Sequence, residues 1–96
     1  KKKDVFALTV NGDSMIDACI ADGDMVLMEP IKDSYSLRNG SIVSALVPGL
    51  GTTLKYFFKK GGKILLEAAN PNYETIELNL DEVVFQGKLL AVWRKI

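Results

Sequence analysis

Short apolar runs, separated by glycine, proline or asparagine about every ten residues, form the main pattern of this chain. Many residues in these runs are β-branched or aromatic, which is typical of strands bounded by turns. The pattern predicts strands at residues 5–10, 25–28, 41–47, 52–59, 64–68, 75–78 and 83–94. We therefore expect an all-β fold, a single domain of mostly antiparallel strands. The first strand should be buried, and Gly87 should bend or bulge the last one.

Two turns predict how three of these strands pair. Pro48-Gly49-Leu50-Gly51 and Lys60-Gly61-Gly62-Lys63 supply residues that accept the positive φ angles and fixed geometry of hairpin turns. These turns predict a three-stranded meander made of residues 41–47, 52–59 and 64–68. A short helical turn is expected at residues 14–20, which Asp13 or Ser14 could cap.

Composition and charge exclude several classes of protein. The 96 residues include 12 basic and 12 acidic side chains, and this balance argues against DNA binding by the chain alone. Lys1-Lys2-Lys3 is expected to be a solvated end. With no histidine and one cysteine, Cys19, the chain has neither an intramolecular disulfide nor a usual zinc site, and no metal or other cofactor is expected. No apolar stretch approaches the roughly 20 residues of a membrane span, so we expect a cytoplasmic protein without a membrane anchor.

The absence of histidine also limits the chemistry open to a nucleophilic serine. A Ser-His-Asp triad is excluded, and a lysine held neutral is the main remaining group that could take the serine proton. Ser14 follows Gly12-Asp13 at the end of a predicted strand, where backbone N–H groups of a tight turn can point outward together. Lys55 lies inside an apolar run, and burial there would lower its pKa from about 10.4.

Each of these residues also has an ordinary structural interpretation. Ser14 could be a turn or capping residue, and Lys55 could lie on an edge strand or extend its amine to water. Asp22-Gly23-Asp24 could be a carboxylate pair, but Asp-Gly-Asp between strands is mostly turn chemistry. Trp93 could belong to the core or anchor an interface. We expect the methionines to fill the core, at Met15, Met25 and Met28.

Several motifs together resemble the catalytic domain of LexA-type repressors, the group that also holds UmuD-like polymerase accessory proteins and phage repressors. They occur in the family's order: Gly12-x-Ser14-Met15, Asp22-Gly23-Asp24, and Thr53-x-Lys55. Further matching positions are Val10, Ile20, Asn39-Gly40, Asn70, Tyr73, Ile76, Gly87 and Arg94. The resemblance covers nearly the whole of residues 1–96 and implies a LexA or signal-peptidase-like β fold.

The resemblance also implies a function and partners. Ser14 would be the nucleophile, Lys55 the neutral base, and the backbone N–H groups of Asp13 and Ser14 the oxyanion site. The substrate would be a peptide bond of the same protein, typically Ala-Gly and in some members Cys-Gly, in a cleavage loop that folds into the site. RecA filaments would stimulate cleavage, the domain would form a homodimer, and operator DNA would be bound only through a separate N-terminal domain.

Three departures from the family's pattern accompany this resemblance. Neither Ala-Gly nor Cys-Gly occurs in the sequence, and only thirteen residues precede Ser14. The cleavage loop and the DNA-binding domain are therefore expected upstream of these residues. Ala68-Ala69-Asn70 replaces a common Pro-Glu-Asn. The alternatives are a UmuD-like accessory protein, a phage repressor dimerisation domain with little catalysis, or an unrelated β protein, which would require an exposed Lys55.

Overall fold

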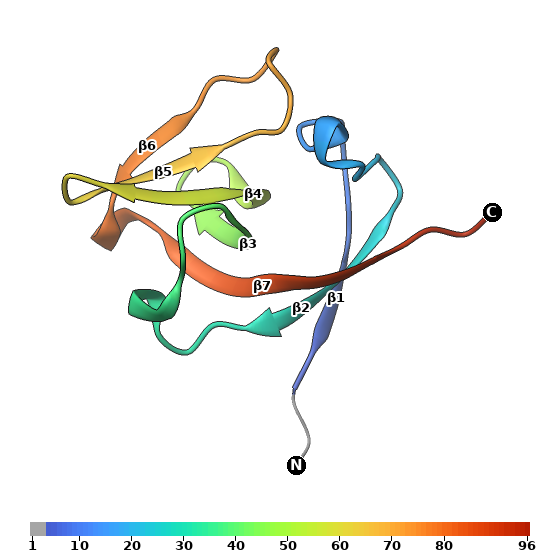
Figure 1. Ribbon diagram of the computed structural model, residues 1–96, viewed down its shortest axis with the longest axis horizontal. Coiled ribbons are helices and arrows are strands. Elements are labelled where there is room, and N and C mark those ends of the chain that lie inside the picture. The colour runs from blue at the N-terminus through green and yellow to red at the C-terminus, as the bar shows by residue number, and fades with distance from the viewer. Residues whose placement is uncertain (1–3) are drawn as a thin grey trace.

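One antiparallel sheet of seven strands organises the protein in a computed structural model that describes residues 4–96. The strands are β1 (Phe6–Thr9), β2 (Met25–Pro30), β3 (Ser41–Val47), β4 (Gly51–Lys60), β5 (Lys63–Glu67), β6 (Ile76–Asn79) and β7 (Val84–Trp93). Their order in the sheet is β1-β2-β7-β3-β4-β5-β6 (Figure 1). The all-β prediction is confirmed. The expectation for Lys1 to Lys3 lies outside the described residues.

The predicted meander is confirmed, with β4 between β3 and β5. The β3–β4 connection contains Gly49 at φ 81°, and β4 begins at Gly51 with φ 76°. Lys60 pairs with Lys63 across Gly61-Gly62, and both glycines have positive φ. Two successive positive φ angles match the twist of the flanking strands in a two-residue hairpin, so local sequence alone defines this register.

β7 joins the two halves of the sheet because it pairs with β2 on one side and with β3 on the other. Ala45 lies opposite Phe85 and Ser44 opposite Gly87, so Gln86 is the extra residue of a bulge. The predicted irregularity is therefore one residue before Gly87. The backbone of Gly87 is packed closely against the side chains of Phe6 and Met28. A Cβ at this position would lie 2.6 Å from Cζ of Phe6 and 2.9 Å from Cβ of Met28.

The prediction that the first strand is buried is wrong. β1 is the edge strand of the sheet, and its residues alternate between half-buried and exposed. One face of β1, which carries Phe6 and Leu8, packs against the buried cluster that contains Met15 and Met28, and the alternate residues lie on the exposed face.

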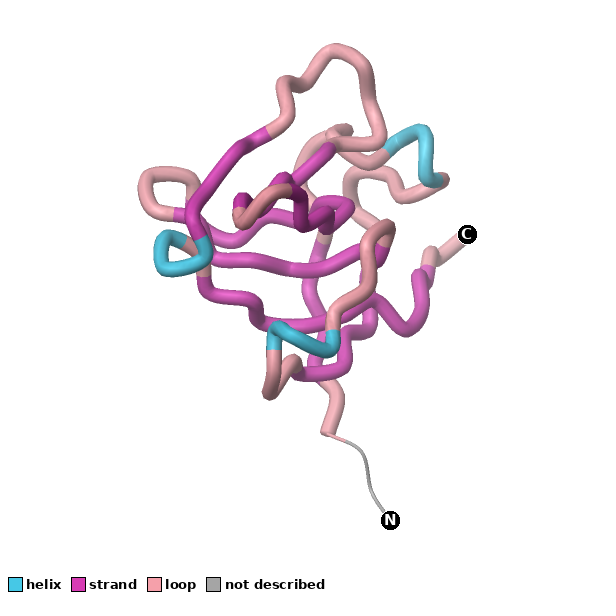
Figure 2. Tube along the Cα trace, turned by 60° about the vertical axis from the view of Figure 1, so that its left-hand side comes forward, coloured by secondary structure: helices cyan, strands magenta, loops and turns pink. Residues whose placement is uncertain are grey.

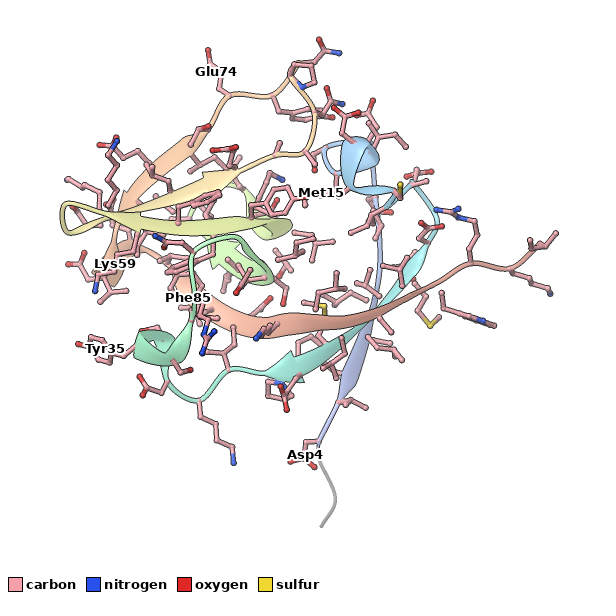
Figure 3. The ribbon with its side chains drawn as sticks, in the orientation of Figure 1. Asp4, Met15, Tyr35, Lys59, Glu74 and Phe85 are labelled. Carbon is pink, nitrogen blue, oxygen red and sulfur yellow. The ribbon has the colours of Figure 1, made fainter. Side chains whose placement is uncertain are left out.

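Two clusters of apolar side chains form the core. One lies under the meander, where the rings of Phe57 and Phe85 meet edge to face at 5.4 Å. The other holds Met15 and Met28, both buried, and Figure 3 shows Met15 in the space beside β4. Met25 is only half-buried, so the prediction for the methionines holds for two of the three. Trp93 is 59% exposed, which excludes the core interpretation for this side chain.

Helical structure in the described residues is limited to short 3-10 turns, drawn in cyan in Figure 2. They are η1 (Ile16–Ala18), η2 (Ser34–Ser36) and η3 (Leu80–Glu82). The expected helical turn at residues 14–20 is therefore present as η1. None of the helices in residues 4–96 is long and apolar enough to cross a membrane.

Candidate active site

Ser14 lies in a tight turn between β1 and η1, which we call the Ser14 turn (residues 12–15). Gly12 has a φ of 88°, and its N–H donates to Oδ1 of Asp22 at 2.6 Å. Met15, 1% exposed, anchors the other end of the turn in the core. The N-cap of η1 is Met15, and no side chain bonds there, so the predicted capping by Asp13 or Ser14 is wrong. The hydroxyl of Ser14 has a different neighbour.

That neighbour is Lys55, which lies at a part of β4 with one open edge. β4 pairs with β3 from Gly51 to Phe57 but with β5 only from Tyr56 onward. The edge of residues 51–55 that faces away from β3 is therefore unpaired within the described chain. The Lys55 side chain is nevertheless only 6% exposed, which excludes the interpretations in which it reaches water.

The Lys55 amine has three oxygen neighbours. Its Nζ lies 2.6 Å from Oγ1 of Thr53, 3.1 Å from Oγ of Ser14 and 3.2 Å from the carbonyl oxygen of Leu54. A carbonyl oxygen can only accept, and a hydroxyl can donate or accept. A neutral amine, with two N–H groups, could therefore donate to Leu54 and Thr53 and direct its lone pair at the Ser14 hydroxyl. Residues 41 positions apart thus meet in the geometry of a nucleophile and its base.

Burial also affects the charge of this lysine. Desolvation lowers the pKa of the Lys55 ammonium below its ordinary value, because the charged form loses hydration. Among residues 4–96, no carboxylate forms an ion pair with Lys55, so no such contact raises this pKa again. At a given pH, a larger fraction of Lys55 is therefore neutral than of a solvated lysine, and a general base must be neutral to accept a proton.

Two backbone N–H groups beside the Ser14 hydroxyl remain free. In the described part of the chain, the N–H groups of Asp13 and Ser14 donate to no protein acceptor. Free N–H groups in a turn next to a nucleophile can meet the negative charge that develops on a carbonyl oxygen. The two residues expected to form an oxyanion site thus have N–H groups available for that purpose.

Two hollows meet at Ser14. The first, of about 280 Å³, has a mostly apolar surface, to which Leu8, Val10, Met15, Val26 and Leu54 contribute; its polar lining residues are Thr9, Asn11, Ser14, Thr52 and Thr53. The second, of about 290 Å³, is lined in part by Lys55, Thr53, Asn11 and Tyr73. A chain segment crossing Ser14 could therefore place a small apolar side chain in the first hollow while its backbone passes the amine.

Comparison with known families decides the affiliation. The family model described as Peptidase S24-like matches residues 1–90. The chain belongs to the Peptidase S24-like family. This family comprises the Ser-Lys peptidases of the LexA C-terminal domain, UmuD and phage repressors, so the match confirms the resemblance found in the sequence. Membership in this family points to serine peptidase activity in general.

The remaining sequence candidates have structural partners in this S24-like domain. Asp22 accepts from the Gly12 N–H, while Asp24 accepts from Nε and Nη2 of Arg94, both at 2.7 Å. The Arg94 guanidinium lowers the pKa of Asp24 to about 2. Each carboxylate is thus held by a contact that stabilises the fold, and the geometry gives no support to a catalytic carboxylate pair. Within residues 4–96, no cluster of His, Cys, Asp or Glu could hold a metal ion.

Two residues that contact the Ser14 turn had no role predicted from the sequence. Asn70 and Tyr73, from the β5–β6 loop, both bond to Asp13, at 2.9 Å and 2.6 Å. Both residues were among the positions that match the family, but a match does not tell which atoms they contact.

Proposed function

We propose that the protein is a serine endopeptidase in which Ser14 is the nucleophile and Lys55 the general base. The observation that carries the proposal is the 3.1 Å separation of Ser14 Oγ from the amine of Lys55, a residue that is only 6% exposed. The lowered pKa of Lys55, the free N–H groups of the Ser14 turn and the family match support it.

The proposed reaction needs no cofactor. Ser14 Oγ attacks the carbonyl carbon of the peptide bond while its proton passes to Nζ of Lys55, and the N–H groups of Asp13 and Ser14 bind the oxyanion. The Lys55 ammonium then gives its proton to the departing amine, which leaves an ester on Ser14. Lys55 next takes a proton from water as the water attacks this ester. Collapse of the second tetrahedral intermediate then frees the acid, and the Lys55 ammonium returns its proton to the departing Ser14 Oγ, which regenerates both groups.

We propose that the substrate is a peptide bond in another segment of the same protein, as in the LexA-type proteins that the sequence resembles. Those proteins typically cut Ala-Gly or Cys-Gly, neither of which occurs in these 96 residues. The small apolar hollow beside Ser14 suits the small side chain of such a bond. In this proposal the protein is a cytoplasmic repressor of the SOS type, and RecA filaments on single-stranded DNA stimulate its cleavage.

The direct test is covalent labelling of this chain by a fluorophosphonate, followed by self-cleavage of the full-length protein at alkaline pH. Ser14→Ala and Lys55→Arg should each abolish both reactions. The first removes the attacking hydroxyl, and the guanidinium of the second cannot accept a proton at working pH. Matched controls are Ser36→Ala, an exposed serine, and Lys59→Arg, an exposed lysine on the same strand. Labelling or cleavage of Ser14→Ala at the wild-type rate would refute the proposed nucleophile.

A second candidate role, homodimerisation, is favoured by exposed apolar side chains near the end of β7. Leu90 is 48%, Val92 40% and Trp93 59% exposed. In this role the domain would be a dimerisation module, either of a repressor that binds operator DNA through a separate domain or of a UmuD-like polymerase accessory protein. Analytical ultracentrifugation of Trp93→Ser, with Tyr35→Ser as the control at another exposed aromatic residue, would test it. A wild-type monomer at high concentration would contradict this role.

A further inference from the structure

The loop between β5 and β6 lies against the Ser14 turn and η1, as Figure 1 shows. Three hydrogen bonds join the two segments. The N–H of Asp17 donates to the carbonyl of Ala69 at 2.8 Å, Nδ2 of Asn70 donates to the carbonyl of Asp13 at 2.9 Å, and the Tyr73 hydroxyl donates to Oδ1 of Asp13 at 2.6 Å. Two of the three bonds thus end on the residue that precedes Ser14.

The Asn70 side-chain amide is also held by its own loop, independently of Asp13. Its side chain is buried, with the residue 8% exposed, and its Oδ1 accepts from the N–H of Asn72 at 2.9 Å. Its own carbonyl accepts from the N–H of Tyr73 at 3.2 Å. With the amide oxygen already bonded, the NH₂ group faces the Asp13 carbonyl. The β5–β6 loop therefore presents a donor of defined direction to the Ser14 turn.

Fixing the Asp13 carbonyl fixes the next N–H group. The Asp13 oxygen accepts from Asn70 and also from the N–H of Ile16 at 3.2 Å. No peptide bond in the described chain is cis, so the Asp13 C=O and the Ser14 N–H belong to one planar trans unit and point in opposite directions. Holding the oxygen toward Asn70 thus directs the Ser14 N–H away from the β5–β6 loop. This N–H is one of the two proposed oxyanion donors.

We propose that Asn70 and Tyr73 are positioning residues that set the orientation of the Asp13–Ser14 peptide and thereby aim the oxyanion donor. Asn70 holds the carbonyl of this peptide, and Tyr73 holds the side chain of Asp13 so that the turn cannot rotate. The inference rests on the proposed peptidase function, because it concerns the donor that this reaction needs. Neither residue contacts Lys55 through a hydrogen bond.

The test measures how fast this chain reacts with a fluorophosphonate that carries a fluorophore. In that reaction a bond forms between Ser14 Oγ and phosphorus, the P–F bond breaks, fluoride leaves, and the serine proton passes to Lys55. The phosphoryl oxygen gains negative charge as the bond forms, so the rate depends on the oxyanion donors. Asn70→Asp keeps the shape and the acceptor for Asn72 but removes the donor, and Tyr73→Phe removes only the hydroxyl.

We expect the second-order rate constant to fall about 10²-fold in Asn70→Asp and about 10-fold in Tyr73→Phe, since loss of one oxyanion donor costs about 10²- to 10³-fold. The apparent pKa of the pH–rate profile should remain that of wild type in Tyr73→Phe, because the Tyr73 hydroxyl makes no hydrogen bond to the Lys55 amine. A merely structural role would instead shift that pKa together with the melting temperature. Asn72→Ala is the matched control, because Asn72 bonds to Asn70 only through its backbone N–H, which the substitution keeps.

The outcomes separate this inference from the function on which it rests. Ser14-dependent labelling of wild type, with unchanged rates in both variants, would overturn the positioning role and leave the peptidase proposal standing. Absence of Ser14-dependent labelling in wild type would overturn both. Should Asn70→Asp fail to fold, Tyr73→Phe decides alone: a wild-type rate overturns the inference, and a reduced plateau at unchanged pKa supports it.

Discussion

The Thr53 hydroxyl lies 2.6 Å from the Lys55 amine, closer than the Ser14 hydroxyl at 3.1 Å. The two residues are on the same face of β4, two positions apart, as the period of a strand requires. An acceptor at this place occupies one N–H of a neutral amine and so helps to direct its lone pair toward Ser14. In the proposed mechanism Thr53 would therefore orient the base, which gives the sequence motif Thr53-x-Lys55 a geometric reason.

Thr53→Val should slow Ser14 labelling about 10-fold with little loss of stability, because the lysine remains but its amine is no longer oriented. Labelling rate and melting temperature are the measurements. Thr52→Val is the control, since the exposed Thr52 hydroxyl bonds to Gln86 and not to the amine. An unchanged rate in Thr53→Val would show that the other two oxygen neighbours suffice to orient Lys55.

The burial of Lys55 predicts a pH-dependent cost in stability. Its pKa is lowered on folding, so the unfolded chain binds this proton more readily, and stability should rise as the pH increases from the lowered pKa toward about 10.4. Lys55→Met, which cannot be charged, should melt at or above the wild-type temperature at neutral pH, and the difference should shrink toward alkaline pH. Melting curves across this range, with Lys59→Met as the exposed control, make the measurement. A lower melting temperature for Lys55→Met at neutral pH would contradict it.

The same lowered pKa predicts the rate profile. Labelling of Ser14 should accelerate as the pH rises and reach a plateau above the apparent pKa of Lys55, since only the neutral amine accepts the serine proton. A stopped-flow or gel-based rate measurement from neutral to alkaline pH would give this curve. A flat profile over that range would count against a lysine base.

The Asp24–Arg94 ion pair predicts sensitivity to acid. The pKa of Asp24 is lowered to about 2, and an unfolded aspartate titrates near 3.9, so this contribution to stability is full above about pH 4 and is lost as the pH falls toward 2. Asp24→Asn should be less stable at neutral pH, and the gap should close over this acid window. Melting temperatures from pH 2 to 7 would measure it, with Asp17→Asn, an exposed acid, as the control. A gap that is independent of pH would contradict the role of the ion pair.

Gly87→Ala should destabilise the sheet by about 1–3 kcal/mol, the usual cost of overpacking. The added Cβ would lie 2.6 Å from the Phe6 ring and 2.9 Å from Cβ of the fully buried Met28. Urea unfolding gives the free energy, and Phe6→Ala combined with Gly87→Ala should recover part of the loss. A neutral single substitution would mean that β1 shifts freely at this edge.

Much of the fold could be predicted from the sequence because it depends on local features. The hairpin at Gly61-Gly62 and the meander around β4 follow from residues that accept positive φ and from the apolar runs that flank them. The pairing of β7 with β2 and with β3 could not be predicted in this way, because it joins segments far apart in the chain. The predicted burial of β1 was wrong because burial depends on which segments pack against each face of a strand, and that is decided by the tertiary structure.

By itself, the sequence determined which side chains could perform the chemistry: without histidine, a serine in a turn after glycine and a lysine in an apolar run were the candidates. Only the tertiary structure decided that they meet, because Ser14 and Lys55 are 41 positions apart, with strands β2 and β3 between them. The burial that lowers the Lys55 pKa and the contacts of Asn70 and Tyr73 with Asp13 are likewise tertiary. Burial from solvent and hydrogen bonds between distant residues arise only when separate segments pack together, so neither can be deduced from one segment of the sequence.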